Sequence, residues 1–425
     1  MLTFMVVLFV GLLMISTPIA IVLLAVSGST FYFFLDIPLQ ALVQQLFNGM
    51  DNFILLAIPF FILAGNIMAE GSISRKLVEV MLLMVGRLPG GIAIAAIFAC
   101  IFFAAISGSS PATVIAIGTI MIPALVKHGY DENFSVGLLT SSGSLGILIP
   151  PSIPMVLYAL VMNESVGAMF SAGIIPGLMI GSILVVYSVI KARKHNWKST
   201  KTYTRQEAVK LIVSASWGIA MPVIVLGGIY SGVFTPTEAA AVSVIYALLV
   251  EVFIYRDMSF KRFHKVLKDS VIMSTALLFI IASAMTFIWL LTREQLPNIA
   301  ADFIMAHISN KYVFLLVINI FLLLVGCVMD IVSAIIVISP ILIVALRAFD
   351  INLVHYGIMM IVNIELGFLT FPFGINLFVA MGLTGKSLTQ VGKAVMPFLI
   401  LMIGGLLLIT YIPEISLFLP RLMMP

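Results

Sequence analysis

The chain has 425 residues, of which 62% are hydrophobic and 9% are charged, and its formal net charge is +4. Soluble domains carry about 45–50% apolar and about 25% charged residues, so this composition excludes a water-soluble globular protein, a disordered chain and a nucleic-acid-binding protein. The mean hydropathy of +1.22 indicates an integral membrane protein. The apolar stretches are close to the roughly 20 residues that a membrane-crossing helix needs and exceed the ~10-residue strands of an outer-membrane barrel, so the predicted fold class is all-α.

The first half begins with three predicted apolar spans, near residues 2–16, 18–35 and 52–69. An uncharged run of 37 residues follows at 90–126. As one helix it would be about 56 Å long, too long for a single crossing. Its middle contains Ser107-Gly108-Ser109-Ser110-Pro111, residue types that disfavour a helix interior. We therefore predict a re-entrant helical hairpin with its tip at mid-membrane.

A broken helix and a long span complete the first half. Residues 134–149 form a predicted apolar helix, which ends at the break Pro150-Pro151-Ser152-Ile153-Pro154. A short helix to Met162 and a span over 168–190 follow. The basic stretch at 191–210 is then predicted to be a cytoplasmic linker.

The second half repeats the first when the sequence is compared with itself. Thr17-Pro18 matches Thr235-Pro236 at an offset of 218 residues, and Asp131 matches Asp350 at 219. Matches of this kind in unchanged order favour duplication over chance similarity between apolar runs. The first predicted inverted repeat covers 1–190, with its hairpin tip near 107–111 and its broken helix near 143–154. The linker covers 191–210. The second predicted inverted repeat covers 211–425, with its hairpin tip near 326–333 and its broken helix near 363–376.

The number of crossings predicts the orientation of the two halves. Each half contains an odd number of predicted crossings, five, so the second repeat is expected to be inverted. With the N-terminus outside, the cytoplasmic loops hold 18 of the 22 Lys and Arg residues, in agreement with the positive-inside rule. Segments 74–87, 260–269 and 294–309 are amphipathic or basic on one side, and we predict that they lie in the interface plane, either as connectors or as braces.

Inverted repeats with helices broken at mid-membrane indicate a secondary transporter whose site lies between the repeats. Backbone groups freed by a break cannot stay unpaired in hydrocarbon, so they line a polar cavity or coordinate a ligand. Positive helix N-termini suit a carboxylate, and carbonyl groups at helix C-termini suit Na⁺. The oxygens of the first break carry no formal charge, which favours a monovalent cation over Mg²⁺ or Ca²⁺.

The two breaks therefore supply the predicted site residues. The predicted Na⁺ ligands are Ser107, Gly108, Ser109, Gly143, Gly146, Pro150, Gly326, Cys327, Asp330, Thr370 and Pro372. The predicted substrate-binding residues are Ser109, Ser110, Pro111, Ser152, Thr370, Gly374 and Asn376. The alternative is that the serines and glycines only allow close helix packing.

Asp330 and Glu365 lie within apolar segments and need an explanation, because a carboxylate at mid-membrane costs about 2.5–3.5 kcal/mol unless it is partnered. Three roles are open for Asp330: it binds an ion, it carries a proton, or it caps the half-helix that begins at Ile331. The capping role is an alternative because Asp is a preferred N-cap residue. Glu365 has either a role in proton or ion transfer or a structural pairing. Glu238 follows Thr235 in the position of a capping-box residue.

The sequence contains no enzymatic signature. The motifs HExxH, GxSxG and GxxxxGK[ST] are absent, and none of the five histidines belongs to a catalytic or metal-binding motif. Neither an enzyme nor ATP hydrolysis is therefore expected. Cys100 and Cys327 lie within apolar segments, which excludes a disulfide framework and a CxxC metal site. Na⁺, as the coupling ion, is the only cofactor predicted. An intramembrane aspartyl-type hydrolase that uses Asp330 and Glu365 is the alternative from another functional class.

The residues at the breaks belong to longer motifs spread over nearly the whole chain. These are Ser107-Gly108-Ser109-Ser110-Pro111-Ala112-Thr113, Gly146-Ile147-Leu148-Ile149-Pro150-Pro151-Ser152, Gly232-Val233-Phe234-Thr235-Pro236-Thr237-Glu238-Ala239-Ala240-Ala241 and Met329-Asp330. Together they resemble the large membrane subunit of tripartite ATP-independent periplasmic (TRAP) transporters. Ser333 and the turn at 371–374 depart from the usual pattern of that family.

The resemblance implies Na⁺-driven import of an organic acid across the bacterial inner membrane, by a block that moves as an elevator against a scaffold. Sialic acid is the favoured substrate on overall similarity, and a C4-dicarboxylate is next. The implied partners are a periplasmic substrate-binding protein and a small four-helix membrane subunit, expected as a separate chain because no four-helix segment precedes Leu2. Apart from the lipid bilayer no further partner is expected, neither an ATPase nor a nucleic acid. A stand-alone Na⁺ or H⁺ carboxylate carrier is the alternative.

Overall fold

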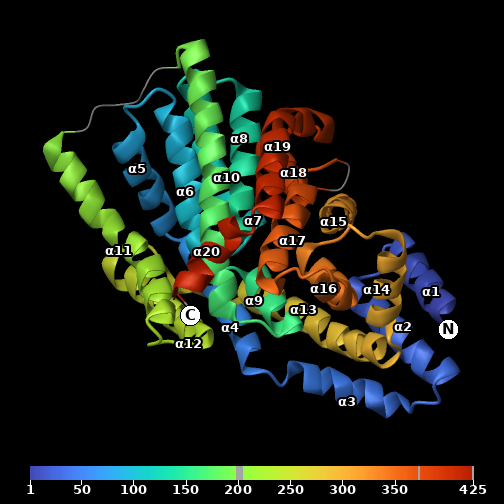
Figure 1. The fold of residues 1–425 in the computed structure, drawn as a ribbon. Coiled ribbons are helices and arrows are strands. Elements are labelled where there is room, and N and C mark those ends of the chain that lie inside the picture. The colour runs from blue at the N-terminus through green and yellow to red at the C-terminus, as the bar shows by residue number, and fades with distance from the viewer. Residues whose placement is uncertain (198–203, 372–373, 424–425) are drawn as a thin grey trace.

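The computed structural model describes residues 1–197, 204–371 and 374–423, and these residues form helices joined by short loops (Figure 1). The first half contains α1 (Leu2–Met14), α2 (Ile19–Phe34), α3 (Leu39–Met50), η1 (Phe53–Leu56), α4 (Ala57–Glu70), α5 (Ile73–Val85), α6 (Gly91–Ser107), α7 (Ser110–Lys127), α8 (Glu132–Gly143), η2 (Ser144–Ile147), α9 (Ile153–Met162) and α10 (Val166–His195). The second half contains α11 (Arg205–Tyr230), α12 (Pro236–Leu249), η3 (Val250–Ile254), α13 (Phe260–Arg293), α14 (Leu296–His307), α15 (Lys311–Gly326), α16 (Ile331–Ala348), α17 (Leu353–Gly367), α18 (Ile375–Thr384), α19 (Leu388–Tyr411) and α20 (Glu414–Met423).

The helices are long and apolar enough for a multi-pass membrane protein. Within the described ranges, eight helical segments meet the length and hydropathy of a membrane span. The all-α membrane fold predicted from composition is therefore confirmed. The eight segments are Phe53–Glu70, Ser110–Lys127, Val166–His195, Arg205–Tyr230, Pro236–Ile254, Phe260–Arg293, Ile331–Ala348 and Leu388–Tyr411.

The helices follow one another in the same order in the two halves. After α6 and α7 come α8, the short α9 and the long α10, and after α15 and α16 come α17, the short α18 and the long α19. The chain leaves helical geometry between α6 and α7 and between α15 and α16, and again before α9 and before α18. The duplication and the opposite orientation of the halves stay predictions.

Two boundaries differ from the sequence analysis. Residues 260–269 are not a separate interfacial helix but the beginning of α13, which contains neither Gly nor Pro and continues to Arg293. The linker predicted at 191–210 is shorter, because α10 extends to His195 and α11 begins at Arg205. Helix α3, which packs against α13 and has no buried residue, was not predicted from the sequence.

The two halves interlock around α17. Helices α4, α7, α8 and α9 of the first half pack against α12, α18, α19 and α16 of the second, respectively. Residues 354–367 of α17 are all buried. Because protein rather than lipid surrounds α17, this helix can carry polar side chains at depth. The candidate site lies where α7, η2, α17 and α18 meet.

The start of α5 is anchored to the second half. Glu251 in η3 accepts hydrogen bonds from the backbone N–H groups of Ser72 at 3.0 Å and Ile73 at 2.9 Å. These are two of the N–H groups that a helix start leaves unpaired. The hydroxyl of Ser72 also donates to Asp257 at 2.6 Å. The connector that leads into the first hairpin is thus held against η3 and the loop that follows it.

Candidate functional site

The tip of the first hairpin gathers several oxygens in a short loop. Helix α6 ends at Ser107, and Gly108 has a φ of 58°, a left-handed conformation that glycine adopts without strain. The hydroxyl oxygens of Ser107 and Thr113 are 3.1 Å apart. Thr113 donates its hydroxyl to the Ser109 carbonyl at 2.8 Å. Backbone and side-chain oxygens therefore lie together at the start of α7.

The broken helix of the same half lies directly against this tip. A Cβ added to Gly146 would lie 2.8 Å from Thr113 Oγ1 and 2.9 Å from the Ser109 carbonyl oxygen. A Cβ on Gly108 would lie 2.9 Å from the carbonyl oxygen of Pro151. Glycine is thus required at both places for the two backbones to approach. The structure brings Ser107, Ser109 and Gly146, all predicted Na⁺ ligands, into one oxygen-rich region.

Other residues predicted at the first break lie at helix ends or in buried loops. Gly143 ends α8, and a Cβ there would lie 3.1 Å from the Val114 backbone nitrogen. Pro150 is buried in the loop that precedes α9, and Pro111 is half-buried in the first turn of α7. Ser152 precedes α9, and its buried hydroxyl forms no hydrogen bond with any described residue.

In the second half, Asp330 is an N-cap. Its Oδ1 accepts a hydrogen bond from the backbone N–H of Ser333 at 3.0 Å, and the Ser333 hydroxyl donates to Oδ2. The capping role, one of the alternatives left by the sequence, is therefore present in the structure.

Three other residues predicted around the second break donate hydrogen bonds within their own segments. Thr370 donates to the Leu366 carbonyl at 2.8 Å, and the Cys327 thiol donates to the Leu323 carbonyl at 3.2 Å. Gly374 N–H donates to the Thr370 carbonyl at 3.1 Å. A Cβ on Gly326 would lie 2.8 Å from the Ile364 carbonyl oxygen, so glycine allows α15 to approach α17. Pro372 lies outside the described residues.

A buried hydrogen-bond network joins the two halves at the centre. The Ser110 hydroxyl donates to Glu365 Oε1 at 2.5 Å. The Asn376 amide donates to Glu365 Oε1 at 2.9 Å, to Ser110 Oγ at 2.6 Å and to Ser144 Oγ at 3.3 Å. Of the seven residues predicted to bind substrate, Ser110 and Asn376 are therefore in direct contact, although 266 positions separate them.

Two acceptors of this network retain free capacity. Glu365 Oε2 and Asn376 Oδ1 are buried and form no hydrogen bond with the described residues. Unpaired buried acceptors attract a cation, a proton or water. Both interpretations of Glu365 thus have a structural basis, because one of its oxygens pairs the halves and the other remains available.

The two acids that the hydrolase alternative requires have separate surroundings. Asp330 bonds to the first turn of α16, whereas Glu365 bonds to α7 and α18. Their hydrogen-bond partners are therefore not shared, and these contacts do not form a paired-acid centre. Glu238 forms the predicted capping box with Thr235, which confirms its structural role.

The predicted site residues did not include Thr113, Ser144 or a second polar cluster. In that cluster, Asn363 on α17 donates to Asn319 Oδ1 at 2.6 Å, and Asn319 donates to Thr410 Oγ1 at 3.0 Å. Thr113 had a readable signal, since a threonine four residues after a carbonyl at a helix start commonly bonds back to it. The Asn cluster joins three helices, and sequence spacing carries no signal for such a contact.

These features define a multi-pass helical membrane protein with a polar site at its buried centre. Residues 6–415 match the family described as "Tripartite ATP-independent periplasmic transporter, DctM component". The chain belongs to this family of TRAP transporter large permeases, as the sequence motifs predicted.

Three curated relatives match over nearly their full lengths. The C4-dicarboxylate TRAP transporter large permease protein DctM of Rhodobacter capsulatus is 39% identical, covering 98% of each chain. The protein of the same name from Pseudomonas aeruginosa is 43% identical, covering 94% of this chain and 93% of the relative. The sialic acid TRAP transporter large permease protein SiaM of Vibrio cholerae is 34% identical, covering 97% and 96%.

A solved structure has a similar fold. It is that of the YdaH transporter of Alcanivorax borkumensis, which has an unusual topology. The match has a TM-score of 0.63 over 87% of this chain and 86% of that one, at 12% sequence identity. At this identity the similarity concerns the fold alone.

Proposed function

We propose that this chain is the Na⁺-coupled permease of a three-component system that imports an organic acid across the bacterial inner membrane. The observation that carries the proposal is the contact between the first hairpin tip and the first broken helix, where Ser109, Thr113 and Gly146 bring neutral oxygens together. Family membership supports transport as the activity. The coupling ion, the partners and the inward direction are parts of the proposal.

Neutral oxygens make Na⁺ the fitting coupling ion. The Ser109 carbonyl and the hydroxyls of Ser107 and Thr113 carry no formal charge, whereas divalent cations prefer carboxylate ligands. At the second break, Asp330 would supply a charged oxygen beside the first turn of α16. We therefore propose one Na⁺ at each break.

Helix N-termini make an anion the fitting substrate. Helices α7, α9 and α18 begin at or beside Ser110, Ser152 and Gly374, and each helix start carries a partial positive charge. The Ser152 hydroxyl is unpaired among the described residues and is available as a donor. A carboxylate near these helix starts would satisfy N–H groups that a helix leaves unpaired.

A C4-dicarboxylate now precedes sialic acid as the proposed substrate. The two relatives named for C4-dicarboxylate transport are 39% and 43% identical to this chain, and the one named for sialic acid is 34% identical. This order reverses the preference from the sequence analysis, which rested on overall similarity and named no substrate-reading residue.

The ion gradients are large enough to drive accumulation. A tenfold Na⁺ gradient contributes about 1.4 kcal/mol per ion, and 100 mV contributes about 2.3 kcal/mol per net charge. Two Na⁺ with a monoanion would support roughly a thousandfold accumulation or more. Two Na⁺ with a dianion move no net charge and would support about a hundredfold accumulation.

We further propose that the two halves are inverted and that hairpins and broken helices move together as an elevator against a scaffold. The equal order of helices in the halves and the anchored connector α5 support this arrangement. A periplasmic binding protein would deliver the substrate and a small four-helix subunit would complete the scaffold.

Uptake into liposomes tests the proposal. The chain is reconstituted with and without the small subunit and the binding protein, and uptake of succinate, malate and sialic acid is followed with and without a Na⁺ gradient. We expect uptake only with Na⁺ and all three components. Unchanged uptake in Na⁺-free buffer at an intact membrane potential would remove Na⁺ coupling. Full uptake by the chain alone would support a stand-alone carrier and contradict the tripartite system.

A further inference from the structure

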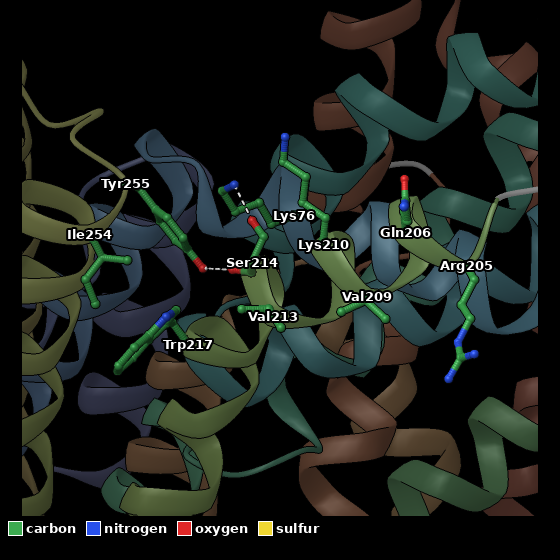
Figure 2. A pocket seen from close by; sticks show the side chains of 10 residues that line it. All are labelled: Lys76, Arg205, Gln206, Val209, Lys210, Val213, Ser214, Trp217, Ile254 and Tyr255. Carbon is green, nitrogen blue, oxygen red and sulfur yellow. Dashed lines mark hydrogen bonds between the residues drawn. The ribbon is translucent and has the colours of Figure 1, made fainter.

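A surface pocket lies outside the proposed transport site, between α5, the first half of α11 and the end of the α12–η3 segment. Its volume is about 770 Å³. Figure 2 shows that its α11 residues run from Arg205 at one end to Trp217 at the other, with Lys76 of α5 and Tyr255, which follows η3, pointing toward Ser214. The central polar network does not reach this place and leaves the pocket without a function.

The polar wall of the pocket is preformed. The Lys76 ammonium group donates to Ser214 Oγ at 2.5 Å and lies 4.6 Å from the centre of the Tyr255 ring. The Tyr255 hydroxyl donates to the Ser214 carbonyl at 2.5 Å. Because Ser214 holds both side chains, the cation of Lys76 has a defined position before any ligand arrives.

The pocket carries a positive charge that the protein balances only in part. Its lining includes Lys76, Arg205 and Lys210 and contains no acidic residue. Within the described part of the chain, none of these three cations belongs to an ion pair. Glu251 does not line the pocket but interacts electrostatically with Lys76, so Lys210 and Arg205 carry the unbalanced charge. The charge favours an anionic ligand.

The pocket changes from basic to apolar along α11. Lys210, Val213 and Trp217 follow one another at helical spacing on the face that lines it, and Lys210 is about 10 Å from Trp217 along the axis. Val213 is 60% exposed and Trp217 is 44% exposed. Tryptophan prefers the membrane interface, with cations above it and aliphatic groups below. The gradient therefore matches the order of phosphate, glycerol and acyl chain in a phospholipid.

We propose that this pocket binds an anionic phospholipid of the cytoplasmic leaflet. Its phosphodiester group lies between Lys76 and Lys210, and its acyl chain lies along Val213 and Trp217. The basic start of α11 belongs to the predicted cytoplasmic side, where anionic lipids attract Lys and Arg. A soluble anion fits less well, because it would leave the apolar half of the pocket uncovered. The lipid would join α5, which leads into the first hairpin, to α11.

Native mass spectrometry of the purified full-length chain tests this assignment, with the chain alone and in complex with its small subunit. Phosphatidylglycerol and phosphatidylcholine are offered in defined amounts, and inorganic phosphate and glycerol phosphate are offered as soluble competitors. The test variant is Lys76→Gln with Lys210→Gln, and Lys210→Gln alone serves as a variant that removes only an exposed group. The matched control is Lys261→Gln with Lys268→Gln, two exposed cations at the start of α13.

We expect the double pocket variant to retain at least fivefold less phosphatidylglycerol than the control variant, with phosphatidylcholine unchanged. Lys210→Gln and Trp217→Ala should each lower retention at least twofold. Equal retention in the pocket and control variants would overturn the proposal. So would displacement of the lipid by millimolar phosphate or glycerol phosphate, which would identify a soluble anion. Loss of lipid upon assembly with the small subunit would identify that subunit as the occupant and would also overturn it.

Discussion

Replacement of Gly146 by alanine probes the proposed Na⁺ site at the first break. The backbone of Gly146 does not need the left-handed region, so only the space for the added methyl group decides the outcome. That methyl would lie 2.8 Å from Thr113 Oγ1 and 2.9 Å from the Ser109 carbonyl oxygen. To restore ordinary van der Waals contact, these oxygens must move by roughly half an ångström.

The size of the effect follows from this overlap. Adding a methyl group to a well-packed region typically costs about 1–3 kcal/mol. If Na⁺ requires both oxygens in their native positions, the cost falls on the Na⁺-bound state, and each 1.4 kcal/mol weakens binding about tenfold. The half-saturating Na⁺ concentration of the Gly146→Ala variant is therefore expected to rise about 5- to 150-fold.

The assay is uptake into liposomes as a function of Na⁺ concentration, together with the rise in unfolding temperature that Na⁺ produces in the purified chain. Gly382→Ala in α18 is the matched control, because nothing lies within 4 Å of a Cβ built there. We expect the control to retain normal Na⁺ dependence. An equal half-saturating Na⁺ concentration in the two variants would refute the assignment of Na⁺ to the region of Ser109, Thr113 and Gly146.

Three further predictions concern other contacts of the chain. Asp330→Asn should weaken the Na⁺ dependence of uptake more than it lowers the unfolding temperature, and equal losses would favour a purely capping role. Ser110→Ala removes a hydroxyl that donates to the buried Glu365, so the free energy of unfolding should fall by about 1–3 kcal/mol. An unchanged denaturation curve would contradict this expectation. The hydroxyl of Ser72 donates to Asp257 and holds the pKa of that carboxyl below its ordinary value of about 3.9. The ionised carboxylate therefore stabilises the folded chain at neutral pH, and this stabilisation is lost as the pH falls through the lowered pKa. The unfolding temperature of Asp257→Asn should therefore change less between about pH 5 and about pH 3 than that of the unmodified chain, and identical slopes would argue against the contact.

Local features of the site could be predicted because neighbouring residues determine them. The set of Ser, Gly and Pro at 107–111 cannot continue a helix, and α6 ends at Ser107 while α7 begins at Ser110. The spacing of Thr235 and Glu238 predicts a capping box, which the structure contains. Prediction failed at 260–269, where the basic residues suggested a separate helix although no helix-breaking residue separates them from the apolar part of α13.

The amino-acid sequence by itself determined the all-helical membrane class, the positions where helices break and the family, because hydropathy, helix-breaking residues and motifs act within short stretches of chain. Only the tertiary structure decided that Ser110 and Asn376 meet at Glu365 and that Lys76 faces α11. These contacts join residues far apart in the sequence, and they depend on how α7, α17 and α18, or α5 and α11, pack together. Helix packing is set by the shapes of whole surfaces, so spacing along the chain does not encode it in a readable form.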